Sequence, residues 1–381
     1  MDNKPWSNWV PGVLSDSQII EIGTYGLIEN LLKYKEDISY SSFDLHLSGD
    51  VYRMKNGAIK PNGGRYCQKY LLNSKFAEKL SPTNENVFTL DIKTTYVIEV
   101  EEKFNLLDEI CNANIFGQAT AKSSIGRVDV LARLIVDGMQ EYESFTPENI
   151  KLGTGQMFVE VTPITFKINI KPGISLSQLR LFIGNPEESE INSKILFKNV
   201  LHNEKSDNTL SVNLVPVDQE GTVAFRAKQS IEEPISLWLD KINIGYSRDD
   251  YWELIPCADF ESERRIRIEK DRFYILKSDE RISIPESIAV YCRAMDESLG
   301  EMRIHYAGFV HPFFGLDRKD KKKGTPLIFE VRGHDVIVNL VHKEILAKLI
   351  FYRMSRNPKD SRVEGYNDQE LTLSKFFRKP N

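Results

Sequence analysis

Two stretches of the chain carry the same pattern of apolar residues and lie 170 positions apart. Residues 155–182 align with residues 325–352 without a gap, with five identities in 28 positions, and Glu160 falls on Glu330. Short segments rich in β-branched and aromatic residues, separated by Gly, Pro and Asn turns, continue along most of the chain, as expected of strands. The sequence therefore predicts a mainly β fold with few short helices, in which one domain is duplicated.

A polar stretch around residues 184–209 interrupts the strand pattern and marks the connection between the two copies. A chain of 381 residues has room for about two domains, each with its own core. We expect a first domain over residues 1–190, a linker over 191–208 and a second, diverged domain over 209–355. The remaining residues, 356–381, form a C-terminal tail that is a candidate lid.

The composition argues against several classes of partner. With 50 basic and 55 acidic residues and a net charge of -5, the chain has no overall basic surface for nucleic acid. No run approaches the roughly 20 apolar residues of a membrane helix. The four cysteines are far apart and form no CxxC pair, so the sequence indicates neither a zinc site nor a disulfide framework. We therefore expect a cytoplasmic protein that binds neither nucleic acid nor membrane.

Residues 122–127, Lys-Ser-Ser-Ile-Gly-Arg, have the composition of a phosphate-binding turn, and we call them the cradle. Ser and Arg side chains donate several hydrogen bonds to phosphate oxygens, and Arg127 can do so in bidentate fashion. Gly126 allows a ligand to approach the backbone closely. Glu160, in an apolar strand further along, adds a lone carboxylate that can act as an acid or base. These residues alone do not identify a reaction.

The second copy differs at the positions that correspond to the cradle. When residues 123–127 are laid over residues 297–301, the hydroxyl of Ser123 and the guanidinium of Arg127 both become carboxylates. A polyphosphate would be repelled there. We therefore predict that the first copy binds the nucleotide, and that Glu330 in the second copy is a relic or a structural hydrogen-bond acceptor.

Eight segments, taken in order, resemble the dCTP deaminases of the dUTPase-like superfamily, in their long two-domain bacterial form. They are residues 12–14, 42–47, 122–129, 178–181, 225–228, 251–253, 305–315 and 365–375. The resemblance implies tandem dUTPase-like (β-clip) domains and a homotrimer with sites between subunits. It also implies that dCTP is hydrolysed to dUTP and ammonia, which supplies dUMP for thymidylate synthesis.

The resemblance also implies a mechanism without zinc, in which a carboxylate activates the attacking water. By position, Glu160 matches the family's catalytic glutamate, with a pKa that burial would raise, and Ser123 and Arg127 complete the catalytic set. Mg²⁺ is expected to accompany the triphosphate. The positions that match nucleotide contacts are Lys122, Ser124, Gly126, Gln178 and, in the closing tail, Tyr366, Gln369 and Lys375.

One departure from the family pattern leaves the location of the site open. The hairpin that holds the sugar usually has Asp before Pro, whereas the second copy has His311 there and the first copy has no clear version of the hairpin. Either sites form between first and second copies, or each first copy uses another loop. Two alternative functions also remain: a bifunctional dCTP deaminase and dUTP pyrophosphatase, and a non-catalytic regulator that binds deoxynucleotides.

Overall fold

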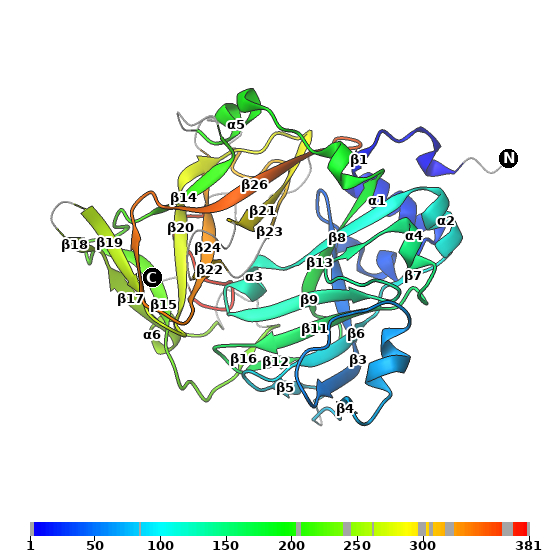
Figure 1. The fold of residues 1–381 in the computed structure, drawn as a ribbon, viewed down its shortest axis with the longest axis horizontal. Coiled ribbons are helices and arrows are strands. Elements are labelled where there is room, and N and C mark those ends of the chain that lie inside the picture. Colours follow the sequence, from blue (N-terminus) through cyan, green and yellow to red (C-terminus); the bar gives the residue numbers. More distant parts are fainter. Residues whose placement is uncertain are drawn as a thin grey trace.

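The computed structural model describes residues 4–83, 85–202, 207–238, 245–260, 263–295, 302–304, 308–316, 324–359 and 369–378. Two groups of strands lie side by side, one in blue to green and one in green to orange (Figure 1). The elements up to β13 form what we call the first half, and those from β14 onward form the second half. The predicted fold class, mainly β with few short helices, is confirmed.

The first half is organised around one large sheet. Its strand order is β10 (Ser144–Phe145), β8 (Ile115–Ala121), β13 (Ser175–Ile183), β3 (Phe43–Met54), β6 (Tyr96–Val100), β11 (Met157–Pro163) and β9 (Val130–Val136). β1 (Gly12–Val13) pairs with β13, and β4 (Ala77–Lys79) pairs with β3. A separate ribbon joins β2 (Ile28–Glu29) to β7 (Lys103–Phe104).

A second large sheet forms most of the second half. Its order is β17 (Trp252–Pro256), β15 (Thr222–Ala227), β20 (Phe273–Ile282), β14 (Thr209–Asn213), β26 (Ile345–Arg353), β21 (Ile288–Ala294) and β23 (Gly308–Val310). β24 (Thr325–Gly333) pairs with both β20 and β22 (Met302–Ile304). A smaller sheet contains β18 (Ala258–Phe260), β19 (Glu263–Ile268) and β25 (Val338–Val341).

The helices are short and lie at the ends of strands. The α-helices are α1 (Asp16–Tyr25), α2 (Leu107–Asn112), α3 (Ser123–Gly126), α4 (Pro147–Ile150), α5 (Lys194–Val200) and α6 (Arg248–Tyr251). The 3-10 turns are η1 (Pro5–Asn8), η2 (Leu31–Asp37) and η4 (Pro186–Ser189), and η3 (Cys67–Leu71) is a π turn. Among the described residues, no helix is long and apolar enough to cross a membrane.

Strand β11 shows how side chains divide between the two faces of the first sheet. Met157, Val159 and Val161 point into the main core, because successive side chains of a strand face opposite ways. Phe158 belongs instead to a separate apolar cluster that includes Tyr66 and Tyr70. Glu160 alternates with the main-core residues, so it lies on the face of the sheet that carries Phe158.

The main core continues from the first half into the second. Phe166 of the first half is fully buried and makes edge contacts with the rings of Tyr251 and Trp252, at centroid distances of 5.7 and 5.8 Å. Nearby, β16 (Ile235–Ser236) of the second half pairs in parallel with β12 (Ile168–Ile170), which also pairs with β5 (Phe88–Leu90). The two halves therefore share buried apolar surface and one small sheet.

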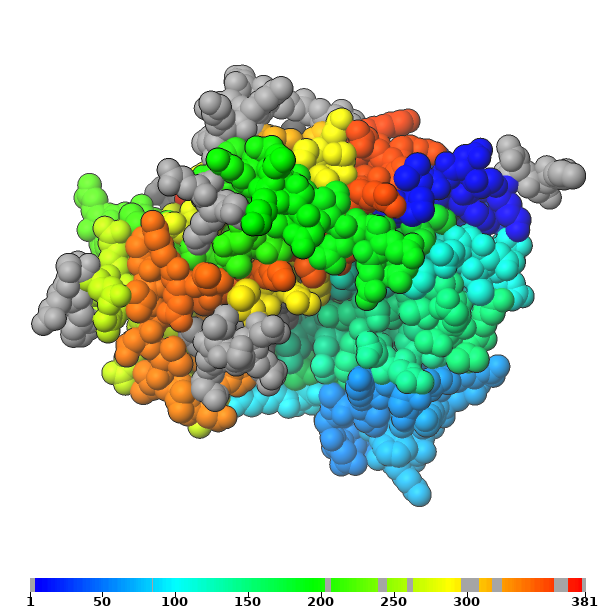
Figure 2. All heavy atoms as spheres, turned by 45° about the horizontal axis from the view of Figure 1, so that its top comes forward, coloured from blue at the N-terminus to red at the C-terminus, as the bar shows by residue number. Residues whose placement is uncertain are grey.

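A further junction lies where the chain passes from one half to the other. Val13 of β1 bridges to Met354, which follows β26, and Glu190, which follows η4, bridges to Tyr352 of β26. In Figure 2 the blue N-terminal segment, the green segment that follows the first half and the orange-red end of β26 lie side by side. The predicted linker, residues 191–208, contains α5. The predicted domain boundaries stay a prediction.

The described part of the C-terminal tail is packed against the protein. Phe376 and Phe377 belong to the main core, together with Leu373. Phe377 contacts the ring of Trp252 edge-on at 5.7 Å. Burial of these apolar side chains therefore anchors residues 369–378 against the protein.

Phe166→Ala tests how much the shared core contributes to stability. Removing a buried phenyl ring should lower the free energy of unfolding by about 3–5 kcal/mol, because it leaves a cavity among Tyr251 and Trp252. Urea unfolding at equilibrium measures the difference. Ile195→Ala is the control, since Ile195 is 76% exposed and should change stability by less than about 0.5 kcal/mol. Equal losses in the two variants would contradict a shared core at Phe166.

Candidate active site

The cradle forms a single helical turn between two core strands. Lys122, in extended conformation, caps α3, and its carbonyl accepts the backbone N–H of Ile125 at 2.8 Å. The Ile125 side chain is buried in the main core and so anchors the turn to it. Ser123 is exposed, whereas Ser124 is buried. Figure 1 shows α3 at the boundary of the two halves, on the side of β24.

Arg127 leaves the cradle toward the second half and is almost completely buried, with 3% of its surface exposed. Its Nη2 donates a hydrogen bond to Oε1 of Gln369 at 2.8 Å, and its Nη1 donates to the carbonyl of Thr372 at 3.3 Å. Its Nε lies 4.0 Å from the carboxylate of Glu330. The guanidinium is thus held between the tail and a buried acid.

Glu330 lies on β24 and faces this guanidinium from the other half. Its side chain is 8% exposed, and burial raises its pKa to about 8, although the charge of Arg127 acts in the opposite direction. Within the part of the chain that the structure describes, neither carboxylate oxygen accepts a hydrogen bond. A carboxyl group with such a pKa exchanges protons near neutral pH, and its oxygens remain available to a ligand or water.

Glu160 is also buried, but both of its oxygens already have partners. Nη2 of Arg133 donates to Oε1 at 2.5 Å, and the hydroxyl of Tyr142 donates to Oε2 at 2.9 Å. The guanidinium of Arg133 also stacks on the Tyr142 ring, 3.9 Å from its centroid. Neither partner belongs to the cradle. The structure brings Glu330, and not Glu160, to Arg127.

Two aspartates and a second lysine lie near Lys122, the first residue of the cradle. Lys122 forms an ion pair with Asp44 of β3. The pKa of Asp37 is lowered, first by a hydrogen bond from His46 and then by the charges of Lys122 and Lys375. The structure therefore brings Lys122 and Lys375, which the sequence analysis assigned to nucleotide binding, to the same surface around Asp37.

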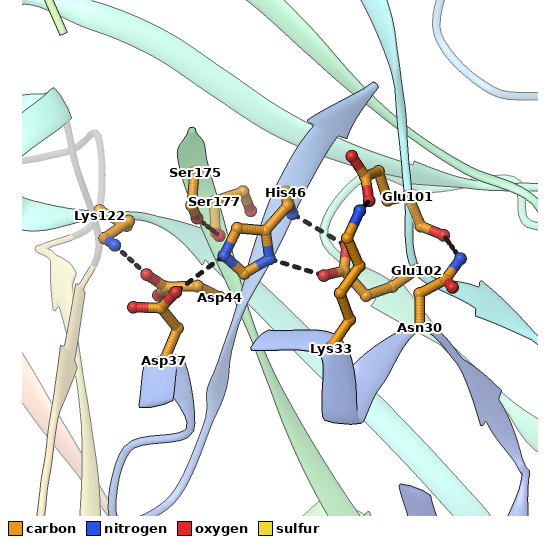
Figure 3. A network of polar contacts seen from close by, with 10 residues as sticks. All are labelled: Asn30, Lys33, Asp37, Asp44, His46, Glu101, Glu102, Lys122, Ser175 and Ser177. Carbon is orange, nitrogen blue, oxygen red and sulfur yellow. Dashed lines mark hydrogen bonds and ion pairs between the residues drawn. The ribbon is translucent and has the colours of Figure 1, made fainter. Parts of the chain in front are cut away.

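His46 is buried behind this surface, in a network that Figure 3 shows from close by. Its Nδ1 lies 2.6 Å from Glu102 and its Nε2 lies 3.0 Å from Asp37. The Tyr34 ring stacks on the imidazole at 3.5 Å. Burial disfavours the charged ring, but the two carboxylates outweigh that effect and raise the pKa of His46 to about 9. Through its contact with Asp37, the imidazolium on β3 holds η2 in place.

The tail meets the cradle directly. The hydroxyl of Ser374 donates to the carbonyl of Ser124 at 2.7 Å, and Gln369 contacts Arg127. The other predicted tail residue, Tyr366, lies outside the described residues. The described part of the tail therefore contacts the cradle, and its role as a lid over the nucleotide stays a prediction.

The two remaining predicted positions lie close to the cradle in the chain or in the sheet. Gly126 is buried in α3. Gln178 lies on β13, opposite Asp44 of β3 in the ladder, and its Oε1 accepts a hydrogen bond from Ser42 at 3.1 Å. Asp44 forms an ion pair with Lys122, so the ladder neighbour of Gln178 contacts the cradle.

His311, in the predicted sugar hairpin of the second half, contacts the first half. Nδ1 of His311 lies 2.9 Å from the hydroxyl of Ser41, which belongs to the first half. The same hydroxyl accepts a hydrogen bond from the fully buried Arg180, at 3.2 Å, and Arg180 in turn donates to the carbonyl of Val290 at 3.0 Å. His311 therefore adjoins the first half, as the explanation with sites between the two copies requires.

The surroundings of Glu330 are what sequence reasoning did not foresee. The alignment of the repeats placed it opposite Glu160, and the missing cradle in its own copy suggested a relic or a structural hydrogen-bond acceptor. The available signal was the division of motifs, with the cradle in the first copy and the predicted sugar hairpin in the second. The structure places Glu330 4.0 Å from Arg127, and the roles of both residues stay predictions.

A search for metal ligands finds no group of three or more His, Cys, Asp and Glu side chains arranged to hold an ion, within the described ranges. The predicted Mg²⁺ is consistent with this result if the phosphates of the nucleotide supply its ligands.

The family models and a solved structure point to the same family. The family model for the N-terminal domain of 2'-deoxycytidine 5'-triphosphate deaminase matches residues 10–185, and the model for the C-terminal domain of the same family matches residues 187–377. Among solved structures, the chain is similar to the crystal structure of 2'-deoxycytidine 5'-triphosphate deaminase from Agrobacterium tumefaciens. That match has 26% identity and a TM-score of 0.78, and covers 91% of this chain and 97% of the other. A search of curated proteins finds no significant match.

His46 makes stability depend on pH. Because its pKa is raised on folding, from 6.5 to about 9, its contribution is complete below about pH 6.5 and is lost as the pH rises through 9. The free energy of unfolding should fall by about 3 kcal/mol over that range. In His46→Asn this fall should disappear, whereas Glu101→Gln, in the adjacent exposed ion pair with Lys33, should retain it. Urea titrations between about pH 6 and 10 measure the effect, and an unchanged slope in His46→Asn would contradict it.

Proposed function

Because the chain belongs to the 2'-deoxycytidine 5'-triphosphate deaminase family, we propose that it hydrolyses dCTP and releases dUTP and ammonia. One observation carries the mechanism: a buried carboxyl group, Glu330, lies opposite the cradle and 4.0 Å from Arg127. The cradle comes from the first half and the carboxyl group from the second, so a nucleotide bound by the cradle would meet the acid across the boundary.

Glu330 is the proposed general base and acid. As the oxygen of a water molecule bonds to C4 of cytosine, Glu330 takes a proton from that water and passes it to N3. It then transfers the proton of the new hydroxyl group to the amino nitrogen, the C4–N bond breaks, and ammonia leaves as the C4 carbonyl forms. A group whose pKa is about 8 is suited to both directions of transfer near neutral pH.

The cradle and its neighbours are proposed to bind and orient the triphosphate. Ser123 and Lys122 offer a hydroxyl and an ammonium group on the accessible side of α3, and the exposed Lys375 approaches the same surface. The substrate would be the magnesium complex of dCTP, since Mg²⁺ bound by phosphate oxygens neutralises charge that these cations only partly balance. Arg127, being buried, would act on Glu330 and the tail more than on phosphate.

Two expectations from the sequence remain part of the proposal. A homotrimer would place further surfaces of the duplicated domain against one another, and light scattering of the purified protein tests that assembly. A cytoplasmic location fits an enzyme that acts on the deoxynucleotide pool, and cell fractionation tests it.

The product analysis separates the proposed function from its alternatives. Purified protein with dCTP and magnesium should give dUTP and ammonia in equal amounts, as measured by chromatography with an ammonia assay in parallel. Formation of dUMP and pyrophosphate would instead identify the bifunctional enzyme. If dCTP binds and no product forms, the regulator is correct and the proposed reaction is wrong.

Glu330→Gln and Glu160→Gln decide which carboxylate is the base. Glu330→Gln should lower kcat by about 10²–10⁴-fold and leave dCTP binding within a few fold, because the shape of the site is kept while proton transfer is lost. Glu160→Gln, which preserves a side chain of the same size beside Arg133 and Tyr142, should retain most of the activity. The reverse result would show that the assignment of Glu160 from the sequence is correct.

A further inference from the structure

Arg127 can influence Glu330 only while its guanidinium is kept in place. Hydrogen bonds to the C-terminal tail help to hold it, from Nη2 to the side chain of Gln369 at 2.8 Å and from Nη1 to the carbonyl of Thr372 at 3.3 Å. An arginine side chain has many rotamers, and these contacts restrict the positions that the positive charge can take.

Gln369 is itself fixed to the strand that carries Glu330. Its Nε2 donates to the carbonyl of Pro326, in β24, at 3.1 Å, and only 8% of its surface is exposed. The next residue, Glu370, forms ion pairs with Lys277 at 3.0 Å and with Arg281 at 2.6 Å, which hold the tail backbone against β20. One amide side chain therefore connects Arg127 to the strand of the proposed base.

We propose that Gln369 is a positioning residue that holds the Arg127 guanidinium against Glu330, so that docking of the tail prepares the base for reaction. The inference rests on the proposed function and deepens it. It assigns Gln369 an action through Arg127, in place of the direct nucleotide contact predicted from the sequence.

The physical effect is electrostatic. A guanidinium beside a buried carboxylate favours its ionised form, which is the form that accepts a proton from water. Among the described residues, the titratable side chains that face Glu330 are Arg127, from the cradle, and Cys292, from β21. Burial keeps the Cys292 thiol neutral by raising its pKa to about 12, so Arg127 is the charge that adjusts the base.

Gln369→Met tests this role, since it removes the acceptor and keeps a side chain of similar length. We expect the rise of kcat/KM with pH, which reports ionisation of the base in the free enzyme, to move to higher pH by up to about one unit. The variant would then lose about tenfold in kcat/KM near pH 7 and recover most of the loss near pH 10. Because stability also depends on pH through His46, each rate is divided by the folded fraction measured at the same pH, so partial unfolding cannot imitate the shift.

Ser374→Ala is the matched control. It removes the hydrogen bond from the tail to the carbonyl of Ser124 and does not touch Arg127. Its kcat/KM profile should keep the wild-type midpoint, because Leu373, Phe376 and Phe377 keep the tail packed and the acceptor on Gln369 stays in place.

Two outcomes overturn the inference: a Gln369→Met profile with the wild-type midpoint, or a shift of the same size in Ser374→Ala. Failure of the proposed function has a different signature, because the wild-type protein would then release no ammonia from dCTP. Failure of the proposed base is separate again, since Glu330→Gln would then remain active.

Discussion

The arrangement of this molecule depends on a buried acid and a buried guanidinium contributed by opposite halves of the chain. Burial raises the pKa of the Glu330 carboxyl to about 8, and the charge of Arg127 favours its ionised form. The two groups lie 4.0 Å apart, so the halves must remain in register for this effect. A second ion pair, Asp129 with Arg332, lies two residues further along the chain from each of them and also joins the halves.

The two copies of the repeated strand, β11 and β24, place their glutamates in different surroundings. In the first half, Glu160 is fully engaged by Arg133 and Tyr142, so its carboxylate has a structural environment. In the second half, the residue at the same strand position, Glu330, has only the distant guanidinium of Arg127 as an ionic partner within the described chain. The cradle and the predicted sugar hairpin likewise occur in different copies.

The C-terminal tail contacts Arg127 and Ser124 of the cradle, and the network around His46 lies next to the ion pair of Lys122. Phe376 and Phe377 bury apolar surface and so bring Gln369 to Arg127. On the other side, the charged imidazole of His46 holds η2 against β3, next to the ion pair of Asp44 with Lys122. These contacts join residues that are far apart in the sequence, and they leave Ser123 and Lys375 exposed at the surface between them.

The sequence by itself determined the fold class and the family, because strand periodicity and short motifs are local properties of the chain. It also indicated that the tail belongs near the cradle. Only the tertiary structure decided which carboxylate lies opposite Arg127. Glu160 and Glu330 have the same strand context, and they differ in the residues that long-range packing brings to them, Arg133 and Tyr142 in one case and Arg127 in the other. Burial and partner choice are set by contacts between distant segments, and no local pattern records them.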